Sequence, residues 1–260
     1  MAKTFIPPST MKAWQYTTSK GGIEKNLVLK ENVPVPSPKP DQHLVQVIAA
    51  SLNPVDYKGA EHPLIGWLAI PKPATPGNDF SGVMVTPAVG SPYRAGDIVH
   101  GCSGDNLFAG GAIREYTLVK AKYLFPVPEE IDVLEAASIP VAGISAYQSI
   151  VPLVKNGDKI FINGGSGGTG IFAIQIAKIV GCHVTVSCSS ANAELCKSLG
   201  ADVVIDYTKG NVLQALVNTG VMYDYVVDNV GLDKELIWKS YLYTKPQSVY
   251  TMVGGTPALS

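Results

Sequence analysis

A glycine-rich segment at residues 159–170, KIFINGGSGGTG, carries the clearest chemical pattern in the sequence. Within it, Gly165, Gly167 and Gly170 fit the G-x-G-x-x-G spacing of dinucleotide-binding loops. In such loops one glycine permits a tight turn, one lets backbone N–H groups approach a pyrophosphate, and one lets a helix pack against its strand. The helix that follows directs its unpaired N–H groups and the positive end of its dipole toward the anion. The spacing predicts a dinucleotide site, with an ordinary glycine-rich turn as the alternative.

The elements around this loop favour the dinucleotide site. Short apolar runs predict strands at residues 159–163, 183–188, 203–206, 223–228 and 248–253. Helical segments are expected between them, at residues 168–180, 191–199, 211–217 and 233–241. Strict alternation of apolar strands with helices is typical of a doubly wound parallel sheet. The glycine loop lies at the first strand-to-helix turn of this pattern, where such folds bind dinucleotides.

The end of the second predicted strand indicates which nicotinamide cofactor is bound. In an NAD enzyme an Asp or Glu at this point holds the ribose 2′-hydroxyl, whereas here Cys188 is followed by Ser189 and Ser190. Small hydroxyl side chains leave room for a 2′-phosphate and can donate hydrogen bonds to it. We therefore predict NADPH, although residues 191–193 are uncharged. Helix capping stays open as another role for the two serines.

The first half of the chain has a different pattern, with many Pro and Gly residues and no long segment of helical periodicity. Strands are expected at residues 12–16, 27–29, 44–50 and 80–85. The Pro-rich segment 34–40 is expected to be a loop inside this domain, because strand-like sequence resumes at once. Asp132 and Glu135 have capping-box spacing and open an Ala-rich helical segment that runs to Ile150. We predict a β-rich domain over residues 1–134 and a dinucleotide-binding domain over residues 135–260.

Composition narrows the class of partner. The 20 Lys and Arg residues against 21 Asp and Glu residues give a net charge of −1, which supplies no field for nucleic acid or an anionic membrane. The four cysteines have no CxxC spacing, so we expect neither a zinc knuckle nor a disulfide framework but a reducing compartment. No apolar run approaches the roughly 18 residues of a membrane span, and no signal peptide is recognisable. These features predict a cytoplasmic protein that acts on a small molecule.

Motifs in a characteristic order extend over nearly the whole chain. They are SLNPVDYK (51–58), PGNDFSGV (76–83), AGDIVHG (95–101), GGAIREYTLV (110–119), IPVAGISAYQ (139–148), NGGSGGTG, KSLGADVVIDY (197–207) and YDYVVDNVG (223–231). Through them the chain resembles the zinc-independent, quinone oxidoreductase-like branch of the medium-chain dehydrogenase/reductase superfamily. The first motif is most similar to fungal enoyl reductases, plant alkenal/enone oxidoreductases and the chloroplast-envelope quinone oxidoreductase homologue. The resemblance implies an α/β architecture with a GroES-like β-rich domain followed by a Rossmann domain.

Zinc-dependent members of the superfamily test whether a metal is expected. A catalytic zinc needs three protein ligands in an open tetrahedral site. Matching the first-ligand region places Asn53 where a Cys would stand, and matching the G-H-E motif places Asn78 and Asp79 where His and Glu would stand. The four-cysteine structural lobe is missing as well. We therefore predict no metal.

Without zinc, the resemblance implies hydride transfer from NADPH to a quinone or an α,β-unsaturated carbonyl compound. Asn53, Tyr57 and Lys58 are the candidate catalytic residues, because the family places this segment beside the nicotinamide. Lys58 would hold the substrate carbonyl or a cofactor phosphate, Tyr57 would donate a hydrogen bond or proton, and Asn53 would orient either partner. A turn around Pro54, with Tyr57 as a packed wall and Lys58 as a solvated charge, is the alternative. Segment 62–75, expected to form the substrate pocket, is Pro-rich and predicted as irregular.

The remaining candidates bind the cofactor. Backbone groups of Ser166, Gly167, Gly168 and Thr169 are expected at the pyrophosphate, within the frame of Gly165 and Gly170. The resemblance adds Tyr207 to Ser189 and Ser190 near the 2′-phosphate, with strand capping as its alternative role. Four residues at strand ends are expected to line the cofactor cleft, with simple packing as the alternative: Asn229, Val230, Val253 and Gly254.

Two further functions stay open: an enoyl reductase that acts in trans on a biosynthetic synthase, and a non-catalytic NADPH-binding or structural protein. Family members continue into a sixth Rossmann strand, whereas this chain stops at Ser260. We expect either a fragment or truncated product or a shortened natural form, with an incomplete Rossmann domain. The family often dimerises through the missing edge strand, so a homodimer and a monomer both stay open. Peripheral association with an organelle membrane is also left open.

Overall fold

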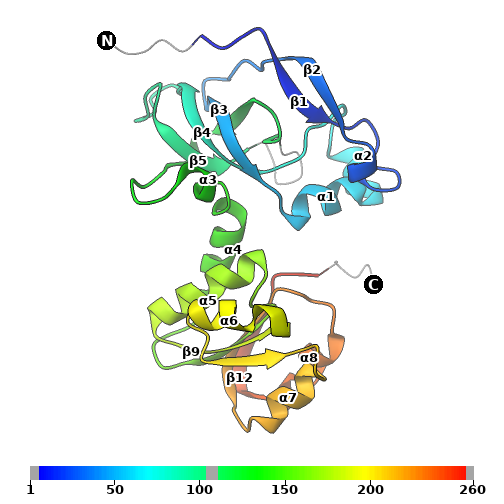
Figure 1. The fold of residues 1–260 in the computed structure, drawn as a ribbon, viewed down its shortest axis with the longest axis vertical. Helices are drawn as coiled ribbons and strands as arrows, with labels where there is room; N and C mark the ends of the chain where they lie inside the picture. The colour runs from blue at the N-terminus through cyan, green and yellow to red at the C-terminus, as the bar shows by residue number, and fades with distance from the viewer. Residues whose placement is uncertain (1–5, 104–110, 256–260) are drawn as a thin grey trace. The chain divides into compact units, whose positions relative to one another are not determined.

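The computed structural model describes residues 6–103 and 111–255 of the chain. Gly110, which opens the motif at 110–119, lies outside the described residues. Contacts divide the chain into two compact units, residues 1–141 and 142–260 (Figure 1). The boundary expected after residue 134 stays a prediction. Within the described ranges, no helix combines the length and apolarity needed to cross a bilayer.

The first unit is built on an antiparallel sheet with the strand order β6-β3-β4-β5-β7. Its strands are β3 (Gln42–Ser51), β4 (Asp79–Thr86), β5 (Ile98–Cys102), β6 (Tyr116–Lys120) and β7 (Leu124–Pro126). Val45, Phe80, Met84 and Val99 form the centre of its core. Beside the sheet, β1 (Thr10–Gln15) pairs antiparallel with β2 (Val28–Pro34). The predicted β-rich domain is confirmed.

Apart from the segment that opens at Asp132, helices in the first unit were not predicted. After the single-turn helix η1 (Ile23–Lys25), the chain forms α1 (Pro54–Glu61) and α2 (Pro63–Leu68). The expectation that segment 62–75 is irregular is therefore wrong for α2. Both helices begin at a proline, which suits the first helical position because its missing N–H has no helical partner there. Because Pro54 and Pro63 were interpreted as signs of turns or irregular chain, the starts of α1 and α2 were not predicted.

The predicted helical segment through Ile150 is divided in two. Asp132 caps α3 (Val133–Ala136), and its carboxylate accepts a hydrogen bond from the Leu134 N–H at 2.7 Å. The chain then leaves the helical conformation before α4 (Pro140–Ile150) begins. The residue before a proline is disfavoured in the α region, so Ile139 is not helical and Pro140 starts the second helix. The short helix η2 (Ala121–Tyr123) lies earlier, between β6 and β7.

The second unit is a doubly wound parallel sheet, as predicted. Its strands are β8 (Lys159–Asn163), β9 (His183–Cys188), β10 (Val203–Asp206), β11 (Tyr223–Asp228) and β12 (Thr244–Met252). They pair in parallel in the order β10-β9-β8-β11-β12, so the first strand of this unit, β8, lies at the centre of the sheet. Ile160 and Ile162 belong to one core cluster and Phe161 to another. This alternation shows that both faces of the sheet are buried.

The helices of the second unit follow the predicted alternation, with differences at their ends. They are α5 (Gly168–Val180), η3 (Ser190–Asn192), α6 (Ala193–Ser198), α7 (Val212–Asn218), α8 (Lys234–Trp238) and η4 (Ser240–Leu242). The helices expected at 191–199 and 233–241 are thus each divided into a short 3₁₀ turn and an α-helix. The last strand starts at Thr244 rather than residue 248, because an irregularity in its pairing with β11 accommodates Pro246.

Candidate cofactor and substrate sites

The glycine loop connects β8 to α5 and closes as a tight turn. Gly167 is the N-cap of α5; its N–H donates to the Gly164 carbonyl at 3.1 Å, and its own carbonyl accepts the Ile171 N–H at 3.0 Å. By helix geometry, the N–H groups of Gly168 and Thr169 have no partner within α5. They are therefore available to an anion at the helix N-terminus.

Glycine stands at the loop positions for two different physical reasons. A Cβ on Gly170 would lie 2.2 Å from the Gly164 carbonyl oxygen, and one on Gly165 would lie 2.7 Å from a side-chain carbon of β9. Protein packing therefore requires glycine at these positions. A Cβ on Gly168 would meet nothing within 4 Å, and one on Gly167 only a carbonyl oxygen at 3.4 Å. Open space beside unpaired N–H groups fits a bound pyrophosphate.

A buried hydrogen-bond chain that sequence reasoning missed holds this loop in place. The Ser187 hydroxyl of β9 accepts the Gly164 N–H at 2.9 Å and donates to the Asn163 side-chain oxygen at 2.5 Å. The Asn163 amide in turn donates to Asp228 at 2.9 Å. Three neighbouring strands are thus joined at their carboxyl ends. The available signal was the presence of polar residues in otherwise apolar strands.

Asp228 extends the same chain toward the ends of β11 and β12. Its carboxylate accepts the N–H groups of Val230 and Gly231 at 2.9 and 2.8 Å, and the Tyr250 hydroxyl at 2.8 Å. Burial and the adjacent Asp228 raise the pKa of Tyr250 above its ordinary value. Tyr250 therefore stays a neutral hydrogen-bond donor. Asp228 fixes the turn that follows β11.

The predicted strand-end residues lie next to the glycine loop. A Cβ on Gly164 would lie 2.8 Å from the Val230 side chain, and one on Gly254 would lie 1.9 Å from the Asn229 carbonyl oxygen. The N–H groups of Val253 and Gly254 both donate to the backbone of β11. The two polar atoms of the Asn229 side-chain amide are buried and find no hydrogen-bond partner among the described residues. An unsatisfied buried amide costs about 1–3 kcal/mol, so this group fits a ligand that supplies a donor and an acceptor.

Ser189 and Ser190 lie at the end of β9, beside a cluster of groups from the next strand. Ser189 is the N-cap of η3, without a hydrogen bond from its side chain to the helix. The Ser190 hydroxyl donates to the Asp206 carboxylate, and the Lys209 Nζ lies 3.6 Å from the same carboxylate. Hydrogen bonds from Ser190 and Thr208, with a contribution from Lys209, lower the pKa of Asp206 to about 2.

Two residues of this cluster, Asp206 and Lys209, were not identified from the sequence. The second strand has no acid at its end, but the third contributes Asp206, and Lys209 brings a cation three residues later. Tyr207 between them has a largely exposed side chain, while its N–H donates to the Cys188 carbonyl at 3.2 Å. The Asn192 amide also donates to the Ser166 hydroxyl at 3.2 Å and ties η3 to the glycine loop. The DYTK sequence, which begins with the last residue of β10, was the signal for Asp206 and Lys209.

In the first unit, Asn53 is the N-cap of α1 and forms a capping box with Asp56. The Asn53 N–H donates to the Asp56 carboxylate at 2.6 Å, and its side-chain amide donates to Asp79 at 2.9 Å. Asp56 also accepts a hydrogen bond from the Asn78 amide at 2.5 Å. The turn considered around Pro54 is therefore the start of a helix. The backbone N–H and the side-chain amide of Asn53 both hold the start of α1 in position.

Asp79 is the centre of this network and is fully buried. Besides Asn53, it accepts the Val141 N–H at 3.0 Å and the Cys102 thiol at 3.3 Å. Burial raises the pKa of Asp79 to about 6, against the lowering effect of its hydrogen bonds. Burial also raises the pKa of Cys102, and the neighbouring Asp79 adds to that rise. The sequence pattern had drawn attention to Asp79 only as a position matched to a zinc ligand.

Tyr57 and Lys58 follow on the outward face of α1. The buried residues of this helix are Asp56, Gly59 and Ala60, whereas the Tyr57 side chain is 43% exposed. The three catalytic candidates are therefore brought together on one helix. Asn53 is fixed internally, and Tyr57 and Lys58 face outward.

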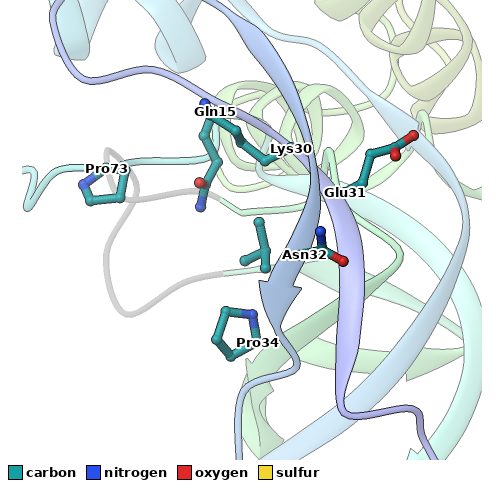
Figure 2. Close-up of a pocket in the computed structure, with 7 residues that line it drawn as sticks. Gln15, Lys30, Glu31, Asn32, Pro34 and Pro73 are labelled. Atoms are coloured by element: carbon teal, nitrogen blue, oxygen red, sulfur yellow. The ribbon is translucent and has the colours of Figure 1, made fainter.

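Two of the pockets lined by described residues lie in the first unit. One, with a volume of about 310 Å³, is lined by Asn53 and Tyr57 among other residues. The second, of about 380 Å³, lies beside the β1–β2 ribbon, with Gln15, Asn32 and Pro34 along the ribbon and Pro73 across from it (Figure 2). None of the predicted site residues lines the second pocket. The first is therefore the pocket associated with the candidate site.

The positions matched to zinc ligands are occupied by a hydrogen-bond network. The amides of Asn53 and Asn78 donate to carboxylates there. Among residues 6–103 and 111–255, no group of three or more His, Cys, Asp or Glu side chains is arranged to hold a metal ion. The expectation of a metal-free site stays a prediction.

Family models match both parts of the chain. The alcohol dehydrogenase GroES-like domain matches residues 39–129, and the zinc-binding dehydrogenase domain matches residues 168–260. The first covers all five strands of the antiparallel sheet, and the second begins at the first residue of α5. These matches agree with the two architectures described above.

Individual proteins resemble the chain over most of its length. Trans-enoyl reductase pgmF of Aspergillus terreus is 46% identical over 259 residues, covering 95% of this chain and 72% of that protein. The chloroplastic NADPH-dependent alkenal/one oxidoreductase of Arabidopsis thaliana is 37% identical over 242 residues, covering 86% of this chain and 58% of that protein. The solved structure of the quinone oxidoreductase from Coxiella burnetii is 33% identical with a TM-score of 0.81, covering 92% of this chain and 74% of that chain. The present chain is shorter than each of them.

Proposed function

The chain belongs to the medium-chain dehydrogenase/reductase family of oxidoreductases, and we propose that it uses NADPH to reduce a quinone or an α,β-unsaturated carbonyl compound without zinc. The observation that carries this proposal is the open space beside Gly167 and Gly168, which protein packing does not explain. The names of the relatives support the substrate class, since they include an enoyl reductase, an alkenal/one oxidoreductase and a quinone oxidoreductase.

Residues of the second unit bind and orient the cofactor. The N–H groups of Gly168 and Thr169 hold the pyrophosphate, and the unpartnered amide of Asn229 pairs with a polar group of the cofactor. Tyr207, Val230, Val253 and Gly254 line the same site. When bound, the nicotinamide supplies a hydride, which carries two electrons to an electron-poor carbon.

Residues of α1 act on the substrate. Lys58 donates a hydrogen bond to the carbonyl oxygen, where negative charge develops as the hydride arrives. Tyr57 then donates one proton. With an α,β-unsaturated carbonyl compound the proton goes to a carbon of the enolate, and with a quinone it goes to an oxygen. Asn53 acts as a positioning residue, because its hydrogen bond to buried Asp79 fixes the first turn of α1.

The preference for NADPH over NADH rests on Ser190 and Lys209. A 2′-phosphate beside them accepts a hydrogen bond from the Ser190 hydroxyl and forms an ion pair with Lys209. In the structure both groups contact Asp206. Because Asp206 is negatively charged and repels a phosphate, the proposal requires both donors to turn from its carboxylate to the phosphate when the cofactor binds.

A second function is supported by the 46% identity to a protein named trans-enoyl reductase. In that case the unsaturated carbonyl belongs to an intermediate carried by a separate synthase, and the chemistry at α1 is the same. A cytoplasmic location is supported by the four cysteines, which are all free thiols.

The test is to mix the protein with NADPH and a panel of quinones and short enones, and to follow the loss of NADPH absorbance. The proposal expects oxidation of NADPH with at least one member of the panel. If NADPH binds and no member is reduced, the simple reductase proposal is wrong, and the trans-acting and non-catalytic alternatives remain.

A further inference from the structure

We infer that the pocket of about 310 Å³ beside α1 binds an apolar tail of the substrate. The inference rests on the proposed function and narrows its substrate class to enones or enoyl compounds with an extended alkyl tail. The tail occupies the pocket while the reactive carbonyl lies at the outward face of α1.

The walls of the pocket come from segments far apart in the sequence. Ile23 belongs to η1, Leu27 precedes β2, Leu52 follows β3, and Ile113 precedes β6. Together with Pro76 they make most of the wall apolar. Tyr57 lines the same pocket, so the catalytic candidate and the apolar wall face one space.

Asn53 and Asp56, two of the polar residues that line the pocket, are engaged in hydrogen bonds within the protein. Asn53 donates to Asp79, and Asp56 accepts hydrogen bonds from both Asn53 and Asn78. The Ile23 N–H donates to the Glu61 carboxylate at 3.0 Å. A ligand therefore finds few unpaired donors or acceptors on this wall, which favours an apolar occupant.

Charge and size restrict the occupant further. Glu24, an exposed residue of the same lining, carries a negative charge that disfavours an anionic tail. A volume of about 310 Å³ is at the lower end of the range for small-molecule sites, which is about 300–1,000 Å³. An alkyl tail fits in a space of this size. Leu52 is 69% exposed, so it presents apolar surface that such a chain would cover.

The inference is tested with a series of straight-chain enones of increasing length. Full burial of one methylene group corresponds to about a fourfold gain in affinity. For the unmodified protein we expect kcat/KM to rise by about threefold per added methylene and then to level off when the pocket is filled. A flat dependence on chain length would overturn the inference.

Variants locate the effect. Leu52→Glu introduces a charge at the pocket and is expected to remove the dependence of kcat/KM on chain length, while Leu52→Trp fills the space and makes the gain stop at a shorter chain. Leu134→Glu is the matched control, because Leu134 on α3 is 61% exposed and does not line the pocket. It is expected to keep the unmodified dependence. Loss of that dependence in the control as well would also overturn the inference.

An unreactive probe separates this inference from the proposed function. In saturation-transfer NMR with 2-decanone, the terminal methyl group is expected to contact the unmodified protein, and Leu52→Glu is expected to abolish that contact. If 2-decanone shows this contact but no enone is reduced, the pocket stands and the proposed function is wrong. If short enones are reduced but the tail makes no contact, the proposed function stands and the inference is wrong.

Discussion

The glycine loop of the second unit and the start of α1 in the first unit differ in how they treat polar groups. At the loop, the N–H groups at the start of α5 have no partner within that helix, and the buried amide of Asn229 has none among the described residues. At α1, Asn53 and Asp56 are engaged in hydrogen bonds with each other, and Asn53 also binds buried Asp79. One region offers hydrogen bonds to a ligand, and the other uses them internally.

This difference explains what each region can recognise. Unpaired backbone donors beside open space suit a phosphate, whose oxygens accept several hydrogen bonds at once. A region with satisfied polar groups presents apolar surface, and it contributes to chemistry through the few groups that extend from it, here Tyr57 and Lys58. We expect changes at the loop to affect cofactor binding and changes at α1 to affect stability and turnover.

The largest effect is expected from the buried carboxylate that holds α1. The folded-state pKa of Asp79 is raised from 3.8 to about 6. Its contribution to stability is therefore fully present below pH 3.8 and is lost as the pH rises through 6. A shift of about two pKa units corresponds to about 3 kcal/mol.

The measurement is the free energy of unfolding between pH 3.5 and about 7.5, for the unmodified protein and for Asp79→Asn. The unmodified protein should lose stability relative to the variant across this range, since all other titrating groups are common to both. Parallel pH profiles would show that Asp79 ionises as readily in the folded chain as in the unfolded one, and the contrast between the two regions would then fail at α1.

The next effect tests the open space at the loop. Gly168→Asp places a carboxylate where a Cβ meets no protein atom, so folding is expected to be preserved, and an acid in the first turn favours the helix dipole. Repulsion of the pyrophosphate should raise the Kd for NADPH by about a hundredfold, measured by titration calorimetry. Gly220→Asp, in a left-handed turn that Asp tolerates, is the control and should leave the Kd unchanged. A Kd within threefold of the original for Gly168→Asp would place the pyrophosphate elsewhere.

How far the sequence predicts each region follows from the same contrast. The loop is local: its glycines, the flanking strand β8 and the helix α5 are consecutive in the chain, so the glycine spacing together with the neighbouring strand and helix patterns identified it. The start of α1 is not local, because Asn53 reaches Asp79 26 residues away, and Asp79 reaches Val141 62 residues away. No spacing rule links such partners, so the network around Asp79 went unpredicted.

The group of residues around Ser190 was predicted in part, unlike the glycine loop, which was predicted, and the network around Asp79, which was not. Ser190 was identified from the end of the second strand, whereas Asp206 and Lys209 come from the end of the third. They become neighbours only because parallel pairing brings β10 beside β9. Short helices were missed for a different reason, since Pro54 and Pro63 are compatible with both a turn and a first helical position.

A smaller effect is expected at the outward face of α1. Lys58→Ala should lower kcat by about thirtyfold, because the charge that develops on the substrate oxygen loses a donor. The Kd for NADPH should stay within twofold if Lys58 acts on the substrate. Lys39→Ala, at an exposed lysine of the Pro-rich loop, is the control for loss of a positive charge. Unchanged turnover in Lys58→Ala would remove Lys58 from the mechanism, and a raised Kd would assign it to a cofactor phosphate instead.

The smallest effect distinguishes the two nicotinamide cofactors. Lys209→Ala should raise the Kd for NADPH by about tenfold and leave the Kd for NADH unchanged, because only the former carries a 2′-phosphate to pair with the ammonium group. The difference should shrink at high salt, as expected for an exposed ion pair. Lys197→Ala removes another exposed lysine of the same unit, paired with Glu194 rather than Asp206, and should alter neither Kd. An equal loss for both cofactors would mean that Lys209 only restrains Asp206, and tighter binding of NADH than NADPH by the unmodified protein would reverse the assignment of Ser190 and Lys209.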